Sequence, residues 1–594
     1  MAVRAIPGTQ VGARALEKQR REGSARSRAM TALRRLGALM RGAITGAVLA
    51  ATLAAGAAAA EASDDTVLLS SAADRFLAVS ISELSAEEYA AALTEYKAVL
   101  ADLASIDYGA LSRDEQVDHD LLVGDLKSRI FNIETVRLHS LHPASYFRLG
   151  RTNALFVRPG AISDSGVRRA VQELERLPRI LVNAEQNLER PARVWTENAL
   201  YEAYYAHMLL RDYVPGAAVD DPELKGDLLA AAKDADVAVS RYENWLREVL
   251  LPRSDRSPAW NPEWIEYLQF TKEGLRDWPL ERMLAFADSD IAQTRASMEA
   301  LARRIHPSGD LRTVWNVMLD EAPPWQEVLP MAQRFVDITS SWLHDEGAHV
   351  VTIPEYIDYG ARISPPMARR ILSFGGATRG PDVAGRQSGY YILTPLEDRL
   401  TEEEAASRIR SYNPYWTHVI SYHEWLGHNV QIAAAREHVD RKIRRNLATG
   451  YFSQAWSFYL EKLLEDEGYF EDRFSHTAAL KHRMARLQMR QWRNVRITTK
   501  LRMALGEMSF DEAVQVYIEE IGMEATNAFI EVQRDSQSPF PPGKEIIGEQ
   551  KILELRAEYQ RRMGEHYRLR NFNDTLLTYG DLPFPQIRRL MFND

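Results

Sequence analysis

Two histidines that flank a glutamate are the residues of this sequence best suited to chemistry. They lie in the segment HEWLGH, from His423 to His428, with Glu424 directly after the first histidine. Neutral imidazole nitrogens bind zinc, and a carboxylate beside the metal can take a proton from a water molecule that the metal activates. The segment therefore predicts a zinc site with His423 and His428 as ligands and Glu424 as general base.

The spacing of the two histidines requires a distorted helix. The surrounding pattern predicts a helix over residues 415–437, and in a regular α-helix side chains five positions apart point about 140° away from each other. A local π-bulge would bring the two rings together, and Gly427 lies where backbone distortion costs least. The alternative interpretation is that both histidines have no catalytic or metal-binding role and are ordinary helix residues hydrogen-bonded to their neighbours.

A third ligand is expected from a second helix, predicted over residues 452–464 and ended by Gly468. Gln454 and Glu461 are seven positions apart, so they share one face of that helix. A carboxylate is a stronger zinc ligand than a neutral amide oxygen, which favours Glu461. Gln454 is the alternative ligand. Glu461 could instead be a solvated or salt-bridged helix residue that binds no metal.

Helices must position these side chains, because most of the chain is patterned for helix. From Asp64 onward, apolar residues recur at spacings of three and four, which predicts a mainly α fold. Four capping boxes predict helix starts, at the pairs Ser85 and Glu88, Ser112 and Glu115, Thr401 and Glu404, and Ser509 and Glu512.

Strands are expected to be few. Residues 389–394 are the best strand candidate, since they are apolar and bounded by a glycine-rich stretch and a proline. Prolines and glycines predict loops over residues 252–262, 375–389 and 535–543. No glycine-rich phosphate loop follows a strand candidate, which argues against a nucleotide cofactor.

The first sixty residues are typical of an export signal. Residues 1–60 carry ten Lys and Arg against two Glu, and the uncharged stretch 42–60 ends with Ala58, Ala59 and Ala60 before Glu61. This pattern predicts a signal peptide with an N-terminal extension, whereas a retained membrane helix is the less favoured alternative. We expect residues 61–594 to form one helical domain that is periplasmic or secreted, without stable membrane insertion after signal removal.

Composition narrows the classes of partner. With 26% charged and 45% hydrophobic residues among 594, the chain is too apolar for a disordered protein. Its net charge is −10, of which residues 61–594 carry −18, so nucleic acid is not an expected partner. The sequence contains no cysteine, so a metal must be held by His, Asp, Glu or carbonyl oxygen.

The sequence resembles the bacterial family called domain of unknown function 885, whose members look like zinc peptidases of the gluzincin clan. The resemblance covers most of residues 61–594 and is carried by GYYILTP from Gly389, by His423 to Gln431, by Trp456 to Tyr469, and by residues 551–556 and 572–583. It implies a large two-lobed, mainly helical, metallopeptidase-like body with a small β-strand element beside the active-site cleft. It also implies Zn²⁺ as cofactor and a short peptide as substrate.

Several positions depart from the family pattern. One residue is missing between Glu424 and Gly427, which gives a motif similar to that of dipeptidyl peptidase III and implies that the short spacing can still bind zinc. The family's third zinc ligand, a glutamate, falls on Gln454, while Glu461 matches a later glutamate of the same motif. The family's histidine and tyrosine near the C-terminus fall on Asn573 and Glu545.

Two functions from different classes follow. The first is an exported zinc-dependent peptidase that hydrolyses short peptides, with Tyr390 and Tyr391 on a strand that pairs with extended peptide and polarises its carbonyl. For these tyrosines, packing in the core or the cleft wall is the alternative. The second function is a catalytically impaired gluzincin-like protein that binds peptides or a partner. The sequence does not indicate an oligomeric state.

Overall fold

The structure is a computed structural model that describes residues 63–157, 162–354, 358–369, 372–379, 387–397 and 400–593. Residues 68–594 form one unit, to which all the elements below belong apart from the start of the first helix. The predicted signal peptide over residues 1–60 lies outside the described residues. Among the residues described, no helix has both the length and the apolar character needed to cross a membrane.

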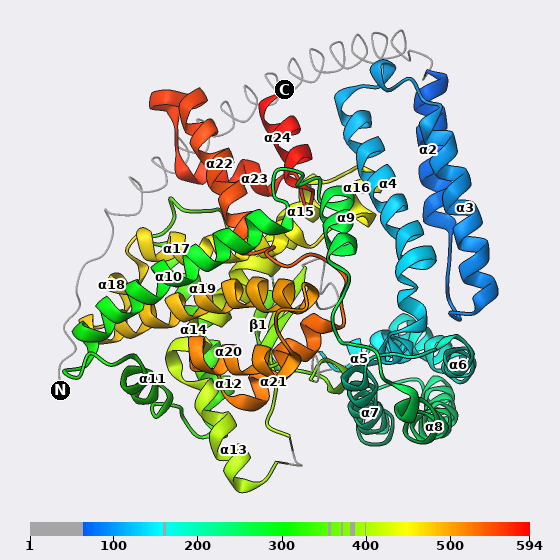
Figure 1. The fold of residues 1–594 in the computed structure, drawn as a ribbon, viewed down its shortest axis with the longest axis horizontal. Helices are drawn as coiled ribbons and strands as arrows, with labels where there is room; N and C mark the ends of the chain where they lie inside the picture. The colour runs from blue at the N-terminus through cyan, green and yellow to red at the C-terminus, as the bar shows by residue number, and fades with distance from the viewer. Residues whose placement is uncertain are drawn as a thin grey trace, which may run out of the picture. The chain divides into compact units, whose positions relative to one another are not determined.

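The prediction of a mainly α fold is confirmed (Figure 1). The helices that precede the sheet are α2 (Asp64–Ala78), α3 (Ala86–Ala104), α4 (Arg113–Phe131), α5 (Gly150–Ala154), α6 (Asp164–Asn187), α7 (Arg193–Met208), α8 (Pro222–Trp245), α9 (Pro262–Lys272), α10 (Leu280–Ile305), α11 (Leu311–Leu319) and α12 (Trp325–His344). The helices that follow it are α13 (Glu402–Ile409), α14 (Pro414–Tyr422), α15 (Val430–His438), α16 (Lys442–Asn446), α17 (Tyr451–Asp466), α18 (Tyr469–Arg473), α19 (His476–Ala504), α20 (Phe510–Ile521), α21 (Ala525–Ser536), α22 (Ile546–Met563), α23 (Leu569–Leu577) and α24 (Phe584–Phe592).

Short helical turns of other pitch connect these helices. The 3₁₀ turns are η1 (Tyr108–Ala110), η3 (Leu138–Ser140), η4 (Pro143–Tyr146), η7 (Leu251–Arg253), η8 (Pro366–Ala368), η9 (Arg410–Tyr412) and η11 (Gly564–His566). The wider π turns are η2 (Asn132–Val136), η5 (Leu209–Tyr213), η6 (Leu246–Leu250) and η10 (His423–Asn429).

All four predicted capping boxes are present. At the starts of α3, α4, α13 and α20, the hydroxyl of the cap residue accepts a hydrogen bond from the backbone N–H three residues later. The glutamate at that later position in turn accepts a hydrogen bond from the backbone N–H of the cap residue. These helix starts were predictable because the motif satisfies local amides and needs no tertiary contact.

The predicted strand is the centre of a small mixed sheet. Strands β1 (Asp358–Ile363), β2 (Gly375–Arg379) and β3 (Ser388–Leu393) lie in the order β1-β3-β2, with β1 parallel and β2 antiparallel to β3. The prediction of a loop throughout residues 375–389 is therefore wrong. A Cβ atom at Gly375 would lie 2.3 Å from the carbonyl oxygen of Ile392, so a glycine typical of a loop here permits two strands to approach closely.

The central position of β3 also overturns one expectation about peptide binding. Both edges of β3 are paired, one with β1 and the other with β2, and every residue of β3 is buried. A peptide cannot add to a strand that has no free edge. The predicted pairing of substrate with this strand is wrong, and β2 is the strand of the sheet that borders the cavity described below.

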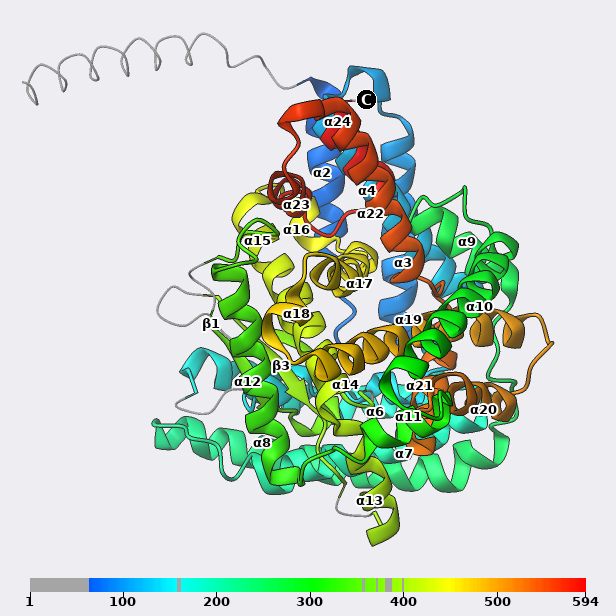
Figure 2. The ribbon, with the colours of Figure 1, turned by 90° about the vertical axis from the view of Figure 1, so that its left-hand side faces the viewer.

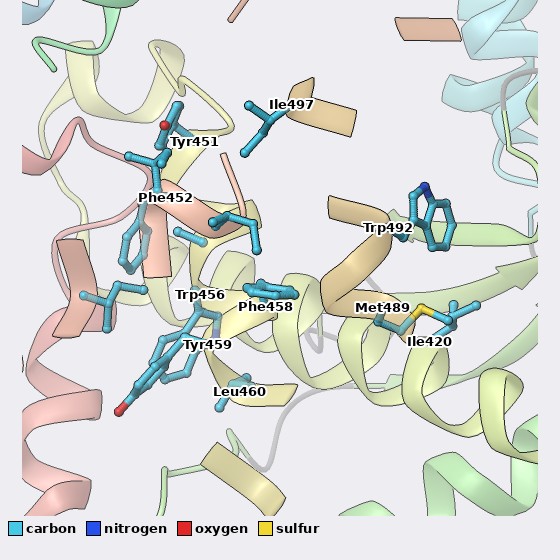
Figure 3. Close-up of a cluster of buried hydrophobic side chains, with 14 of the residues drawn as sticks. Ile420, Tyr451, Phe452, Trp456, Phe458, Tyr459, Leu460, Met489, Trp492 and Ile497 are labelled. Atoms are coloured by element: carbon cyan, nitrogen blue, oxygen red, sulfur yellow. The ribbon is translucent and has the colours of Figure 1, made fainter. Parts of the chain in front are cut away.

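Two large hydrophobic clusters stabilise the part of the fold that is described, beside a small third one at Val157, Tyr390 and Ile392. The smaller of the two large clusters is built mainly from α6, α7 and α8, and the larger one includes side chains of α10, α14, α17, α19 and α22. Helices α10 and α19 lie side by side, and β1 packs against α12 (Figure 2). Both β2 and β3 pack against η10. Figure 3 shows part of the larger cluster, with Phe452 and Trp456 of α17 and Met489 and Trp492 of α19. This packing fixes η10 between the sheet and α17.

Candidate metal centre

The predicted π-bulge is present at the two histidines. Helix α14 continues directly into the π turn η10, which begins at His423 and contains His428, and α15 follows without a break. The wider turn brings the two imidazole rings to a centroid distance of 5.1 Å. One nitrogen of each ring and one carboxylate oxygen of Glu424 all lie within 4.8 Å of one another. These atoms can therefore meet at a single cation.

Gly427 is required by the packing of η10 against α17. A Cβ atom at this position would lie 2.2 Å from the Oγ atom, 2.5 Å from the Cβ atom and 2.7 Å from the Cα atom of Ser457. The backbones of the two helices are thus in contact, and no side-chain rotation of Ser457 would make room for a methyl group. Gly427 was expected to allow backbone distortion, but its main role is to let η10 and α17 approach closely.

We expect Gly427→Ala to destabilise the protein by about 1–3 kcal/mol, the usual cost of overpacking a rigid core, and to weaken metal binding by displacing η10. Denaturant unfolding and a zinc titration measure the two effects. Gly226→Ala is the matched control, since its Cβ atom would meet nothing within 4 Å and the change should be neutral or slightly stabilising in a helix. Equal stability of the two variants would contradict the role assigned to Gly427.

Each histidine is held by its Nδ1 atom. The Nδ1 atom of His423 lies 2.7 Å from Oε1 of Glu461, and Nδ1 of His428 lies 2.9 Å from Oγ of Ser453. Burial raises the pKa of Glu461 to about 7. In its ionised form this carboxylate only accepts, so His423 then donates from Nδ1 and keeps the lone pair on Nε2. In His428, Nε2 is the atom that faces Glu424, 3.8 Å from Oε2. Both rings are thus oriented to offer Nε2 to a metal ion, as ligating histidines do.

Burial controls the protonation of the centre. It lowers the pKa of His423 well below its usual range and, with the neighbouring His423, lowers the pKa of His428 to about 3. Both rings are therefore neutral at pH 7, which is the form that binds metal. Burial raises the pKa of Glu424 to about 8, against the opposing effects of Arg493 and of a backbone hydrogen bond from Ala377 in β2. Such a shift is typical of a general base in a dry site.

The structure separates the two candidates for a third ligand. A cavity of about 580 Å³ is lined by His423, Glu424, His428 and Gln454 among others. Glu461 is 1% exposed and lies on the Nδ1 side of His423, away from the atoms that converge on Glu424. The structure thus brings Gln454 to the cavity wall and places Glu461 behind a histidine.

Tyr390 and Tyr391 do not reach the cavity in the part of the chain that is described. The side chain of Tyr390 packs with Val157 and Ile392, while Tyr391 belongs to the larger hydrophobic cluster. Burial raises the pKa of Tyr391 well above its usual value. Both tyrosines thus adopt the packing role that was the alternative to carbonyl polarisation.

Two departures from the family pattern have different consequences. Asn573 is buried outside the cavity and donates from Nδ2 to the carbonyl oxygen of Val350 at 2.8 Å. Its replacement of a histidine therefore leaves the centre itself unchanged. Glu545 lines the cavity and accepts a hydrogen bond from Arg496 at 2.5 Å, so a carboxylate paired with a cation stands where the resemblance implies a tyrosine.

The cavity also contains charged residues that were not predicted. Besides the predicted Glu424, its wall includes five basic and three acidic residues, namely Arg493, Arg496, Lys500, Arg534 and Lys544, and Glu531, Asp535 and Glu545. The sequence contains a pattern that includes two of these arginines, because arginines recur along α19 at spacings of three and four, at positions 486, 490, 493 and 496. Such a row is more often a solvated helix face, and only the fold shows that it is buried.

Comparisons with known proteins agree with this fold. Residues 73–591 match the family described as "Bacterial protein of unknown function (DUF885)". A "putative lipoprotein of unknown function" from Shewanella oneidensis has a similar structure, with a TM-score of 0.66, 19% identity, and coverage of 89% of this chain and 97% of that chain. A "putative lipoprotein" from Colwellia psychrerythraea matches with a TM-score of 0.66, 16% identity, and coverage of 85% and 90%. A search of curated proteins found no match.

Proposed function

The chain belongs to the DUF885 family, and from this membership and the geometry of its metal centre we propose that it is an exported zinc-dependent peptidase that hydrolyses short peptides. One observation carries the proposal. Two buried, neutral imidazoles and the carboxylate of Glu424 converge at the wall of a cavity, with donor atoms within 4.8 Å of one another. This donor set fits zinc, which takes neutral imidazole nitrogen and carboxylate oxygen as ligands when no thiolate is present.

His423 and His428 would hold the zinc ion through their Nε2 atoms, with Gln454 as the neighbouring oxygen donor at the cavity. Glu461 would keep His423 in the correct tautomer and orientation, since carboxylates that accept from the second nitrogen of a ligating histidine raise its affinity for metal. Bound zinc would supply Lewis acidity, which makes water nucleophilic near neutral pH and polarises a peptide carbonyl.

Glu424 would act as the general base. Its carboxylate is held by the Ala377 backbone and faces His428, so it can accept a proton from the attacking water and pass that proton to the leaving amine. Strand β2 is an edge strand of the described sheet, and Gly375, Gly376 and Ala377 line the cavity. An extended peptide could lie along this edge. A cavity of about 580 Å³ suits a short peptide better than a folded protein.

Export is part of the proposal. The segment 1–60 carries a basic region followed by an uncharged stretch and small residues, which is the pattern of a secretory signal. Two proteins of similar structure are described as putative lipoproteins, and lipoproteins are exported. We therefore propose a periplasmic or secreted enzyme that acts on short peptides and binds no nucleic acid.

One observation favours a second candidate function. A neutral amide, Gln454, occupies the position where the resemblance implies a carboxylate ligand, and Glu545 is paired with Arg496 where it implies a tyrosine. A site with these changes could bind peptides or a partner without hydrolysing them. The intact convergence of His423, Glu424 and His428 is why we prefer the peptidase.

Metal analysis tests the proposal. We expect one zinc ion per chain in protein purified without chelator, loss of peptide cleavage after chelation, and recovery on adding zinc. Zinc at 100-fold above its Kd should also stabilise the folded protein by about 2.7 kcal/mol, seen as a higher melting temperature. Protein that lacks stoichiometric zinc, and that gains neither stability nor cleavage when zinc is added, would rule out the peptidase. Stabilisation by zinc without cleavage of any peptide would instead support the binding protein.

A further inference from the structure

Arg493 is a buried cation without a close acidic partner. It lies on α19, lines the cavity and is 6% exposed. Its nearest carboxylate among the described residues is that of Glu461, with Nη2 to Oε1 at 3.9 Å, and its buried Nε atom has no hydrogen-bond partner in the structure. The other contacts of its guanidinium are with the Met489 sulfur at 3.3 Å and the ring of Trp492. A buried charge of this kind is costly unless a ligand pairs with it.

The other arginines of the same row on α19 show the contrast. Arg486 is paired with Glu465, and Arg490 with Glu549 at 2.7 Å. Arg496 contacts both Glu531 at 2.8 Å and Glu545 at 2.5 Å. The fold thus supplies close carboxylates for three of the four positions and leaves the fourth one, beside the metal centre, to face the cavity.

The acidic residues of the cavity offer no corresponding place for a substrate amine. Glu531 and Glu545 are both bonded to Arg496, and Asp535 lies 3.4 Å from the same guanidinium. Glu424 is the proposed base. A charged peptide end that enters this cavity would therefore find a cation whose nearest carboxylate is 3.9 Å away, whereas the acidic residues other than Glu424 already contact Arg496. This arrangement favours the C-terminal carboxylate over the N-terminal ammonium group.

We infer that Arg493 binds the C-terminal carboxylate of the substrate, so that the protein removes one or two residues from the C-terminus of peptides. The inference rests on the proposed peptidase function. A guanidinium is permanently charged and matches a carboxylate with two parallel hydrogen bonds. In the reaction, the peptide C–N bond breaks, the hydroxyl of water joins the carbonyl carbon, and the proton taken by Glu424 passes to the released amine.

Arg493 lies near the proposed zinc ligands. Two contacts, of 3.9 Å to Glu461 and from there 2.7 Å to Nδ1 of His423, link its guanidinium to His423, and Arg493 and His423 both line the cavity. One residue of extended peptide spans about 3.3–3.6 Å. A carboxylate held by Arg493 is therefore expected within a few residues of a carbonyl at the metal, which is why we infer the release of one or two residues.

Paired peptide pools test the inference. A pool of N-acetylated tetrapeptides with free C-termini and the same pool with amidated C-termini would be digested by the zinc-loaded protein and followed by mass spectrometry. We expect kcat/KM to fall at least about tenfold on amidation, the scale of a lost hydrogen bond to a charged group, and cleavage to occur one or two residues from the free carboxyl end. In Arg493→Met, cleavage of free acids should fall by a larger factor than cleavage of the amides, so that the preference for free acids is lost.

Two further variants make the result specific. Arg502→Met changes another arginine of α19, which is paired with Asp288 at 2.8 Å outside the cavity, and should keep the full preference for free acids. Lys544 also lines the cavity, and loss of the preference in Lys544→Met but not in Arg493→Met would overturn the assignment. Equal loss of both activities in Arg493→Met would show that the arginine supports the transition state or the fold, and would also overturn it. Cleavage of the amidated peptides as fast as of the free acids would overturn the assignment too.

A binding measurement separates this inference from the proposed function. If neither pool is cleaved with zinc present, the peptidase is disproved, and the melting temperature of the protein with each pool then tests the anchor alone. A larger rise with free acids than with amides, abolished in Arg493→Met and retained in Arg502→Met, supports carboxylate binding. Equal rises with both pools, or no rise with either, contradict it.

Discussion

Glu424→Gln is expected to keep the metal and abolish most of the hydrolysis. Glutamine has nearly the same shape as glutamate, so it can still accept the backbone hydrogen bond from Ala377 and fill the same space beside His428. It cannot take a proton from water. Since a positioned general base contributes about 100- to 10,000-fold to the rate, we expect kcat/KM to fall at least about 100-fold with one zinc ion still bound.

Peptide cleavage assays and metal analysis of the same preparation measure this prediction. Glu437→Gln is the matched control, because it makes the same change on α15, about four turns of helix further along and half exposed, and should leave both turnover and zinc content unaltered. Unchanged turnover in Glu424→Gln would remove its role as base. Loss of zinc in that variant would instead make Glu424 a metal ligand.

The local features of this fold were predictable from the sequence. The four capping boxes act within one helical turn, and the strand is apolar from Gly389 to Leu393, so both have a local signal in the sequence. The need for a π turn at His423–Asn429 followed from the spacing of two histidines. In each case the chemistry of neighbouring residues was sufficient to define the conformation.

Features that depend on tertiary packing could not be predicted in the same way. Gly375 favours a loop by composition, and only its contact with Ile392 shows why it belongs to a strand. Tyr390 and Tyr391 are consecutive residues of a strand, and the sequence alone is compatible with a place beside a cavity or in the core. Both are buried, because β1 and β2 pair with the two edges of their strand. The row of arginines on α19 has the same explanation, since charge spacing alone does not distinguish a buried wall from a solvated face.

The position of Glu461 illustrates how a correct choice of helix can miss the role of a residue. Gln454 and Glu461 do lie on the same helix, α17, which packs against the π turn. The two residues are about two turns apart, roughly 10 Å along the axis, so they meet different parts of the centre. Gln454 reaches the cavity, whereas Glu461 reaches the Nδ1 atom of His423. The sequence allowed a choice only by the strength of each side chain as a zinc ligand, and this criterion does not show which of the two side chains reaches the cavity.

Substitutions at these two positions are expected to change zinc affinity in opposite directions. Gln454→Glu should tighten binding at least about tenfold, because it places a carboxylate at the cavity wall beside two imidazoles. Glu461→Ala should weaken binding about 10- to 100-fold, the usual cost of removing the partner of a ligating histidine. Titration with zinc against a chelator of known affinity measures both changes.

Glu461→Gln distinguishes an orienting residue from a direct ligand. Glutamine can still accept the hydrogen bond from Nδ1 of His423 through its amide oxygen, so an orienting role predicts that most of the affinity lost in Glu461→Ala is recovered. A ligand role predicts little recovery, because the amide oxygen is a poor zinc donor. Glu465→Gln, one turn further along α17, changes a partly buried glutamate that is paired with Arg486 and with Arg483 at 3.3 Å, and it controls for the loss of a negative charge on this helix. If Glu461→Gln binds zinc as weakly as Glu461→Ala while Gln454→Glu has no effect, Glu461 is itself the third ligand, because the affinity then depends on its carboxylate and on no oxygen at position 454.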